Sequence, residues 1–344
     1  MREGTARSQA PAPSALPEHP PGFPPFRPRA PWWGADLQTL RNVLRPIGLP
    51  RAPVHEQRLS LPMADGSGDR LAALLEEPDG DADSRPLVVL IHGLAGSEES
   101  AYLITSSAHL LSQGHRVLRL NLRGAGPSRA TCRLQYHAGR SEDLRDALLA
   151  LPEELTRHGV ILVGFSLGGN MLLKFLAEFG GLFPIRRAMS VSAPIDLAAA
   201  SERFLDPRNR LYHLRLLHSM KQESLEEGAQ FSDEEAATIR DARSILEFDE
   251  KIVAPRNGFA DAAAYYAACH ARQFLAEIRV PTLVVHALDD PWIPGDAYAS
   301  YPWEKNPHLV PLLPSSGGHV GFHGRGSRVP WHDRCLVRWL EEPA

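Results

Sequence analysis

The segment 160–169, VILVGFSLGG, constrains the fold of this chain more than any other stretch. Its first four residues are apolar and mostly β-branched, which predicts a strand buried on both faces. Apolar residues then recur at the three- and four-residue spacing of a helix with one buried face: Leu167, Met171, Leu172, Phe175, Leu176 and Phe179. A sharp turn must therefore join strand to helix, and Gly164 and Gly168 permit it.

Ser166 lies at the centre of this turn, within the pattern G-x-S-x-G. Such a turn lifts the serine hydroxyl above the edge of the sheet, and the following helix points free backbone N–H groups toward it. The pattern alone is also compatible with a glycine-rich turn that carries a solvated serine. The strand before it and the helix after it favour a nucleophile.

Further apolar runs predict the remaining strands. Two of them, 56–61 and 70–76, flank a turn at Asp65-Gly66; the others lie at 87–92, 115–122, 187–194, 281–286 and 308–314. Helical patterns separate most of these runs, including one after Ser141 with Leu144, Leu148, Leu151 and Leu155 on one face. The alternation predicts an α/β fold with a mostly parallel, doubly wound sheet. Ligands of such sheets bind at the carboxyl ends of the strands.

The chain divides into four parts by composition. Residues 1–31 contain nine of the thirty prolines and predict an unpacked tail. Residues 32–194 and 271–344 carry the sheet pattern, and residues 195–270 predict a helical cap insertion.

Two apolar sets accompany this division. Aromatic and aliphatic residues of the cap are candidates for an acyl pocket or for the core of the cap: Phe204, Leu205, Tyr212, Phe248, Phe259, Tyr265 and Tyr266. After Trp32, a helix is predicted whose apolar stripe packs on the main domain: Trp33, Leu37, Leu40 and Leu44.

His319 is the candidate base for the serine. A serine hydroxyl needs a base within hydrogen-bond reach, and histidine suits this task near neutral pH. His319 follows the last predicted strand and lies in a glycine-rich turn. His92 and His137 are its competitors, although His92 at a strand end is better explained as a brace for the adjacent glycine turn. A loop histidine without a role is the alternative for His319.

A carboxylate must orient this histidine, and the turn after strand 281–286 supplies two. Asp290 is favoured because it directly precedes Pro291 and heads the turn, whereas Asp289 is assigned a structural role. Asp196 is a third option, with a helix N-cap as its alternative. The order Ser166, Asp290, His319 is the one found with this kind of sheet.

The oxyanion hole requires two backbone N–H groups. Leu167, directly after the serine, supplies one, and Leu94 in the turn after strand 87–92 supplies the other. Arg123 lies at another glycine turn, where an arginine braces loops more often than it binds an anion.

Composition excludes several classes of function. The net charge is −4 and no basic cluster occurs, so neither nucleic acid nor an anionic membrane is expected as a partner. Cys132, Cys269 and Cys335 are scattered, which predicts neither disulfides nor a zinc site and fits the cytoplasm. No apolar run is long enough to cross a membrane. No metal or organic cofactor is expected.

Several motifs together resemble the YheT-like α/β-hydrolases, which are related to embryo-specific plant proteins and to animal α/β-hydrolase-domain lipases. They are HGLAGS (92–97), NLRGAGPS (121–128), YHAGRSEDLR (136–145), GFSLGGN (164–170), EFDEKIVAPRNGF (247–259), DDPWIP (289–294) and GGHVGF (317–322). The resemblance spans about residues 32–340 and implies an α/β-hydrolase fold. It implies a carboxylesterase-type serine hydrolase with Ser166, Asp290 and His319 as its charge relay.

The sequence therefore predicts a serine hydrolase that cleaves small carboxylic esters, with short to medium acyl chains or lipid-like, through an acyl-enzyme. Two alternatives stay open. The same acyl-enzyme can transfer its acyl group to an alcohol or a thiol, or the fold can serve as a non-catalytic module that binds a small ligand.

Overall fold

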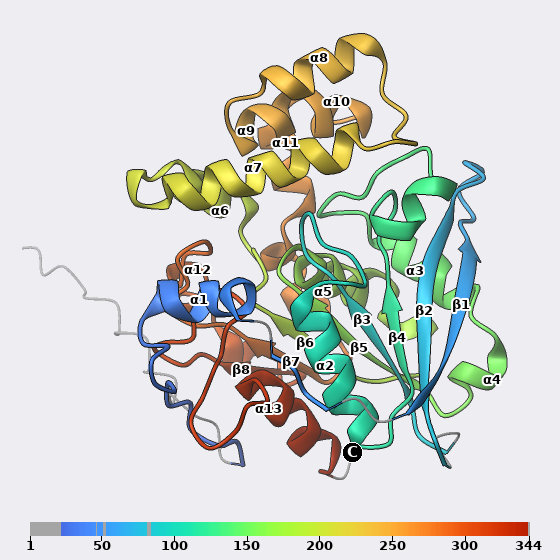
Figure 1. Ribbon diagram of the computed structural model, residues 1–344, viewed down its shortest axis with the longest axis vertical. Coiled ribbons are helices and arrows are strands. Elements are labelled where there is room, and N and C mark those ends of the chain that lie inside the picture. The colour runs from blue at the N-terminus through green and yellow to red at the C-terminus, as the bar shows by residue number, and fades with distance from the viewer. Residues whose placement is uncertain (1–21, 46, 51–52, 81–83, 343–344) are drawn as a thin grey trace, which may run out of the picture.

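The computed structural model describes residues 22–45, 47–50, 53–80 and 84–342, and within them the chain forms one eight-stranded sheet (Figure 1). The order across the sheet is β1-β2-β4-β3-β5-β6-β7-β8. The strands are β1 (Val54–Pro62), β2 (Arg70–Pro78), β3 (Leu87–Ile91), β4 (Val117–Leu120), β5 (Val160–Phe165), β6 (Ile185–Val191), β7 (Thr282–Val285) and β8 (Leu309–Leu312).

The six neighbouring strands β4, β3, β5, β6, β7 and β8 run parallel, whereas β2 pairs antiparallel with both β1 and β4. Antiparallel neighbours need only a short turn, which the segment around Asp65 provides between β1 and β2. Parallel neighbours need a crossover, and helices supply it. The predicted mostly parallel α/β sheet is thus confirmed.

Helices cover both faces of the sheet. In the main domain they are α1 (Ala35–Leu44), α2 (Ala101–Ser112), α3 (Ser141–Leu149), α4 (Glu153–Thr156), α5 (Leu167–Phe179), α12 (Asp296–Ala299) and α13 (Trp331–Leu340). Leucines of α3 and α5 pack on one face, and residues of α2 and α13 pack on the other. Successive β3 residues alternate between these two cores, as the pleat requires, so both faces of the strand are apolar.

A second group of helices lies between β6 and β7 and stands above the sheet in Figure 1. It contains α6 (Leu197–Leu205), α7 (Arg210–Leu225), α8 (Asp233–Asp241), α9 (Ile245–Phe248), α10 (Ala254–Arg256) and α11 (Ala262–Cys269). These helices enclose a small core of their own around Phe204, Leu217, Ile239 and Phe248. We call this group the cap.

Three local expectations were wrong. The helix predicted after Ser141 is interrupted, because Pro152 cannot continue it; α3 ends at Leu149 and α4 begins at Glu153. Residues 22–31, assigned to the unpacked tail, contact the main domain: Phe26 is buried against Phe322 and Trp331. Residues 1–21 of that tail lie outside the described residues.

The third error concerns α1, which forms where expected but turns its other face inward. Trp33, Leu37 and Leu44 are 57%, 41% and 64% exposed. Gln38 and Thr39 are buried instead, because their side chains hydrogen-bond to the loop that follows β8. Satisfying those buried backbone groups outweighs the burial of the apolar stripe.

Arg123 is a brace, as the sequence indicated. Its guanidinium is fully buried and contacts the carboxylates of Asp143 at 2.6 Å, Asp69 at 2.8 Å and Asp65 at 3.0 Å. It thereby joins the turn after β4 to the β1–β2 turn and to α3. None of the helices in the described part of the chain is both long and apolar enough to cross a lipid bilayer.

We predict that Arg123→Met lowers the free energy of unfolding by about 3–5 kcal/mol, because it leaves the buried Asp69 without a cation and the buried Asp143 with Arg140 alone. Urea denaturation of the purified protein measures this. Lys251→Met is the control: its ion pair with Glu247 is half-exposed, so the loss should stay below about 1 kcal/mol. Equal losses in the two variants would contradict the assignment.

Candidate active site

Ser166 lies between the end of β5 and the start of α5, in a conformation that few L-residues adopt: its φ is 52° and its ψ is −122°. Two glycines make this turn possible. A Cβ on Gly168 would lie 2.2 Å from the carbonyl oxygen of His92, and one on Gly164 would lie 2.5 Å from the carbonyl oxygen of Gly168. The backbones of β3, β5 and α5 therefore meet directly beneath Ser166.

His319 and Asp290 complete a chain of hydrogen bonds with Ser166. The His319 Nε2 lies 3.0 Å from the Ser166 Oγ, and its Nδ1 lies 2.8 Å from the Asp290 Oδ2. A carboxylate only accepts, so Nδ1 carries the hydrogen and Nε2 is free to accept the serine proton. The structure thus brings together three side chains that are 29 to 153 residues apart in sequence.

Asp290 is held for this contact by the turn after β7. Its Oδ1 accepts hydrogen bonds from the backbone N–H groups of Trp292 and Ile293, which leaves Oδ2 for His319. Burial raises the pKa of Asp290, but His319, His286 and the Trp292 N–H together outweigh burial, and the net pKa is below the usual value. The carboxylate therefore stays ionised at neutral pH.

The other two candidate carboxylates have different partners. Asp289 accepts a hydrogen bond from the N–H of Gly318 and so supports the loop that carries His319. Asp196 caps the first helix of the cap by accepting from the N–H of Ala199. Neither makes a hydrogen bond with the imidazole among the described residues.

The loop that carries His319 is held by the polar face of α1. Thr39 accepts a hydrogen bond from the backbone N–H of His319 at 2.8 Å, and Asn42 donates to the carbonyl of Val320 at 3.0 Å. Gln38 accepts from the N–H of His323. The sequence reasoning missed this role because it searched α1 for an apolar stripe; the signal available was the cluster of amide and hydroxyl side chains on one face.

Trp292 is a second residue that the sequence reasoning left without a role. Its ring stacks on the His319 imidazole, with centroids 4.3 Å apart and an angle of 28° between the planes. Together with Asp290, this stacking limits the ring to one orientation toward Ser166.

Both predicted oxyanion donors belong to backbone that lies next to Ser166. Leu167 is the first residue of α5, and Leu94 follows Gly93, on which a Cβ would lie 2.9 Å from the Cβ of Ser166. Within the described residues, neither the Leu94 nor the Leu167 N–H donates to an acceptor of the protein. Both donors are free for a ligand.

The competing histidines are engaged elsewhere. His92 donates from Nδ1 to the carbonyl of Gly93 and accepts at Nε2 from the N–H of Leu122. Burial lowers the pKa of His92 to about 4, so it stays neutral and braces the turn. His137 packs against the rings of Phe259 and Tyr265.

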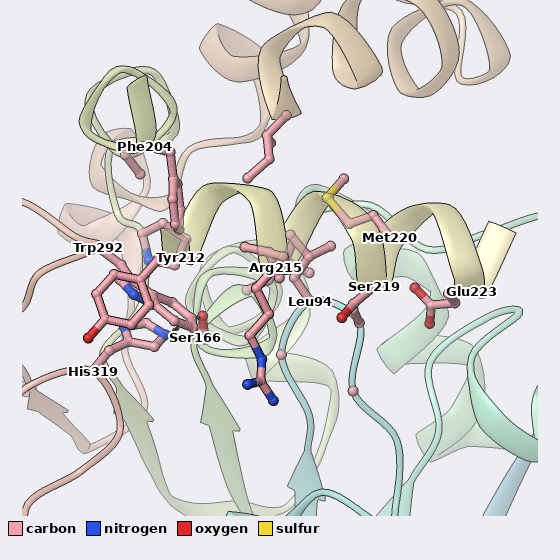
Figure 2. Close-up of a pocket in the computed structure, with 18 of the residues that line it drawn as sticks. Leu94, Ser166, Phe204, Tyr212, Arg215, Ser219, Met220, Glu223, Trp292 and His319 are labelled. Carbon is pink, nitrogen blue, oxygen red and sulfur yellow. Dashed lines mark hydrogen bonds between the residues drawn. The ribbon is translucent and has the colours of Figure 1, made fainter. Parts of the chain in front are cut away.

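A pocket of about 370 Å³ opens between Ser166 and the cap (Figure 2). Of the seven predicted pocket residues, Phe204, Tyr212, Phe248, Tyr265 and Tyr266 line it. Leu205 is 48% exposed and Phe259 packs on Tyr265, so neither is part of the lining. The size and apolar walls suit a small organic ligand.

Figure 2 shows Tyr212, Arg215, Ser219 and Glu223 along the side of α7 that faces the pocket, with Ser166 and His319 at one end and Glu223 at the other. Their three- and four-residue spacing places them on one face of the helix. Over the described ranges, no group of three or more His, Cys, Asp or Glu residues is arranged to hold a metal ion.

Comparisons with known proteins identify relatives of this chain. The family model for the alpha/beta hydrolase fold matches residues 86–223. YheT of Escherichia coli, named as a candidate esterase, is 33% identical over 289 residues, which span 83% of this chain and 84% of that protein. The medium-chain fatty acid ethyl ester synthase/esterase 2 of Saccharomyces cerevisiae is 31% identical over 282 residues, or 74% of this chain and 62% of that protein.

The solved structure of the Pyrococcus furiosus esterase Pf2001 has a TM-score of 0.56 with this chain. The match covers 86% of this chain and 97% of that one at 14% identity, so it shows a shared fold.

The close backbone approach beneath Ser166 leads to a stability prediction. Gly168→Ala should strongly destabilise the protein or prevent folding, because the new Cβ meets the His92 carbonyl oxygen at 2.2 Å. Thermal unfolding followed by circular dichroism measures this. Gly181→Ala is the matched control, since no atom lies within 4 Å of its Cβ position. A Gly168→Ala protein that melts with the wild type would refute this packing.

Proposed function

The chain belongs to the YheT-like α/β-hydrolases and is a carboxylesterase-type hydrolase, and we propose that it cleaves esters through an acyl-enzyme on Ser166. One observation carries the proposal: the Ser166 Oγ, the His319 imidazole and the Asp290 carboxylate form a continuous chain of hydrogen bonds at 3.0 and 2.8 Å.

In the first half-reaction, the Ser166 oxygen attacks the ester carbonyl carbon while His319 Nε2 takes the serine proton. Asp290 accepts the hydrogen bond from Nδ1 and stabilises the imidazolium. The carbonyl oxygen becomes an oxyanion, and the Leu94 and Leu167 N–H groups hold it. Collapse of the intermediate breaks the bond to the alcohol, which leaves with the proton from His319.

In the second half-reaction, a water molecule attacks the acyl group on Ser166. His319 takes the proton of that water and returns it to the serine oxygen as the carboxylic acid is released. Each step uses only side chains and backbone groups already described. The apolar walls of the pocket favour a short or medium acyl chain, or a lipid-like one, as the bound group.

Acyl transfer to an alcohol is the second candidate, because one relative is named as both an ethyl ester synthase and an esterase. Both reactions share the acyl-enzyme and differ only in the acceptor. Separating the products formed with and without added ethanol distinguishes them. A binding module without catalysis is disfavoured, since a binder needs no base beside its serine.

We predict that Ser166→Ala lowers turnover of p-nitrophenyl esters by about 10⁴-fold or more and abolishes labelling by a fluorophosphonate probe. The reason is that no other hydroxyl in the pocket contacts an imidazole base among the described residues. Ser219→Ala, another pocket serine, should still label to full stoichiometry. Labelling that persists in Ser166→Ala would show that Ser166 is not the nucleophile.

Asp290→Asn and Asp289→Asn test the assignment of the acid. We expect Asp290→Asn to lower kcat by about 10⁴-fold, since an amide favours the wrong tautomer of His319. Asp289→Asn should cost about tenfold or less, because Asp289 supports the backbone of the loop that carries His319 and, among the described residues, does not bind the imidazole. Steady-state kinetics on one ester measures both, and the reverse order would exchange the two roles.

A further inference from the structure

We propose that Glu223 of the cap and Tyr136 of the main domain position the oxyanion loop, residues 93–96, so that the seating of the cap controls the rate of the chemical step. Both would be positioning residues. The inference rests on the proposed function, because the loop affects rate only if it holds the charge that develops on the substrate.

The oxyanion loop lies directly against the nucleophile. A Cβ on Gly93 would lie 2.9 Å from the Cβ of Ser166 and 3.1 Å from the carbonyl oxygen of Phe165. A displacement of the loop by about 1 Å would therefore move the Leu94 N–H relative to Ser166, and errors of this size cost rate.

Two tyrosine hydroxyls hold the loop on either side of Leu94. The N–H of Gly93 donates to the Tyr102 hydroxyl at 2.9 Å, and the N–H of Ala95 donates to the Tyr136 hydroxyl at 2.7 Å. The Leu94 N–H between them has no acceptor in the described part of the chain. The clamps leave free the one donor that the oxyanion requires.

Ala95 needs such a clamp because its backbone is strained. Its φ is 52°, in the left-handed region that residues with a Cβ rarely adopt. Strained conformations of this kind persist only where the surroundings hold them. Loss of the hydrogen bond to Tyr136 would let Ala95 relax and move its neighbour Leu94.

The Tyr136 hydroxyl in turn depends on the cap. Its oxygen accepts from Ala95, so its own hydrogen is free to donate, and it lies 2.9 Å from the Glu223 Oε2. Glu223 lies on α7 (Figure 2). A single line of hydrogen bonds thus runs from the cap helix through Tyr136 to the oxyanion loop.

The hydroxyls of Tyr102 and Tyr136 are held in place by different parts of the molecule. Tyr102 lies on α2, and its ring packs against Phe165 of β5, within the main domain. The Tyr136 ring is placed by the main domain as well, through its backbone N–H to Arg123 and an edge contact with His92. Only its hydroxyl is oriented by the cap. The oxyanion loop is therefore held by Tyr102, which depends on the main domain alone, and by Tyr136, whose hydroxyl depends on the position of α7.

The ionisation of Glu223 makes this support sensitive to pH. Burial raises the pKa of Glu223 to about 7; the Tyr136 hydrogen bond and the charge of Arg129 lower it, and Glu226 raises it. Above this pH the carboxylate accepts strongly from Tyr136. Below it the protonated group is a weaker acceptor, and the clamp loosens as pH falls.

Three variants test the line of hydrogen bonds from Glu223 through Tyr136 to Ala95, which we call the relay. Tyr136→Phe and Glu223→Leu each remove a link, and both should lower kcat about 10- to 100-fold, with KM changed less than about threefold. Glu223→Gln keeps an acceptor oxygen but no charge, so its kcat should lie between those of the wild type and Glu223→Leu. Glu227→Leu, an exposed position just beyond α7, is the control and should resemble the wild type. All kcat values are normalised to the sites titrated by a fluorophosphonate.

The pH profile gives a readout that a purely structural role would not move. In the wild type, kcat/KM should fall as Glu223 is protonated near pH 7, and this part of the profile should be missing from Glu223→Gln. The double variant Tyr136→Phe/Glu223→Leu should be no slower than the slower single variant, because the two groups act in series.

Several outcomes would overturn the relay. A raised KM with unchanged kcat in Glu223→Leu would make the carboxyl a substrate contact. Identical pH profiles of the wild type and Glu223→Gln, or additive losses of kcat in the double variant, would show that Glu223 does not act through Tyr136. A full kcat in Tyr136→Phe would refute the relay alone, whereas labelling that persists in Ser166→Ala would refute the proposed function itself.

Discussion

The rest of the site depends on the backbone contact between the start of α5 and the end of β3. Gly168 brings the two main chains together so closely that even a methyl group would overlap the His92 carbonyl oxygen. This contact sets Ser166 in its strained conformation and places the turn after β3 beside it. The nucleophile and two backbone donors therefore share one small volume before any partner side chain arrives. Strain of this kind is commonly stored at functional sites and offset by the surrounding fold.

Polar contacts hold the imidazole in that volume, together with the stacked ring of Trp292. Thr39, Asn42 and Gln38 bind backbone groups of the loop after β8, and Asp290 holds the ring itself. Each contact satisfies a buried backbone or side-chain group that would otherwise be costly. An N-terminal helix that looks peripheral in Figure 1 thus belongs to the support of the site. Arg123 supports the neighbouring turn in the same way, with buried charges paired on several sides.

The cap contributes more than a lid of apolar side chains. Phe204 and Phe248 furnish walls for an acyl chain, while Glu223 provides a carboxyl group at the far end of the same pocket. A partly buried carboxyl group is costly unless it is hydrogen-bonded, and here its partner is a tyrosine that also holds the loop beside Ser166. Binding and chemistry are therefore connected through one helix, α7.

Local pattern was sufficient for the strand–turn–helix around Ser166, for the mostly parallel sheet, and for placing Ser166, Asp290 and His319 in turns that follow strands. These features follow from burial periodicity and turn chemistry, which nearby residues encode. Tertiary structure alone decided which face α1 buries, that residues 22–31 pack against α13, and that Trp292 stacks on His319. It also decided that Tyr136 meets Glu223, 87 residues away. Such contacts join groups whose separation along the chain carries no periodic signal, so only the folded chain specifies which buried donor meets which acceptor.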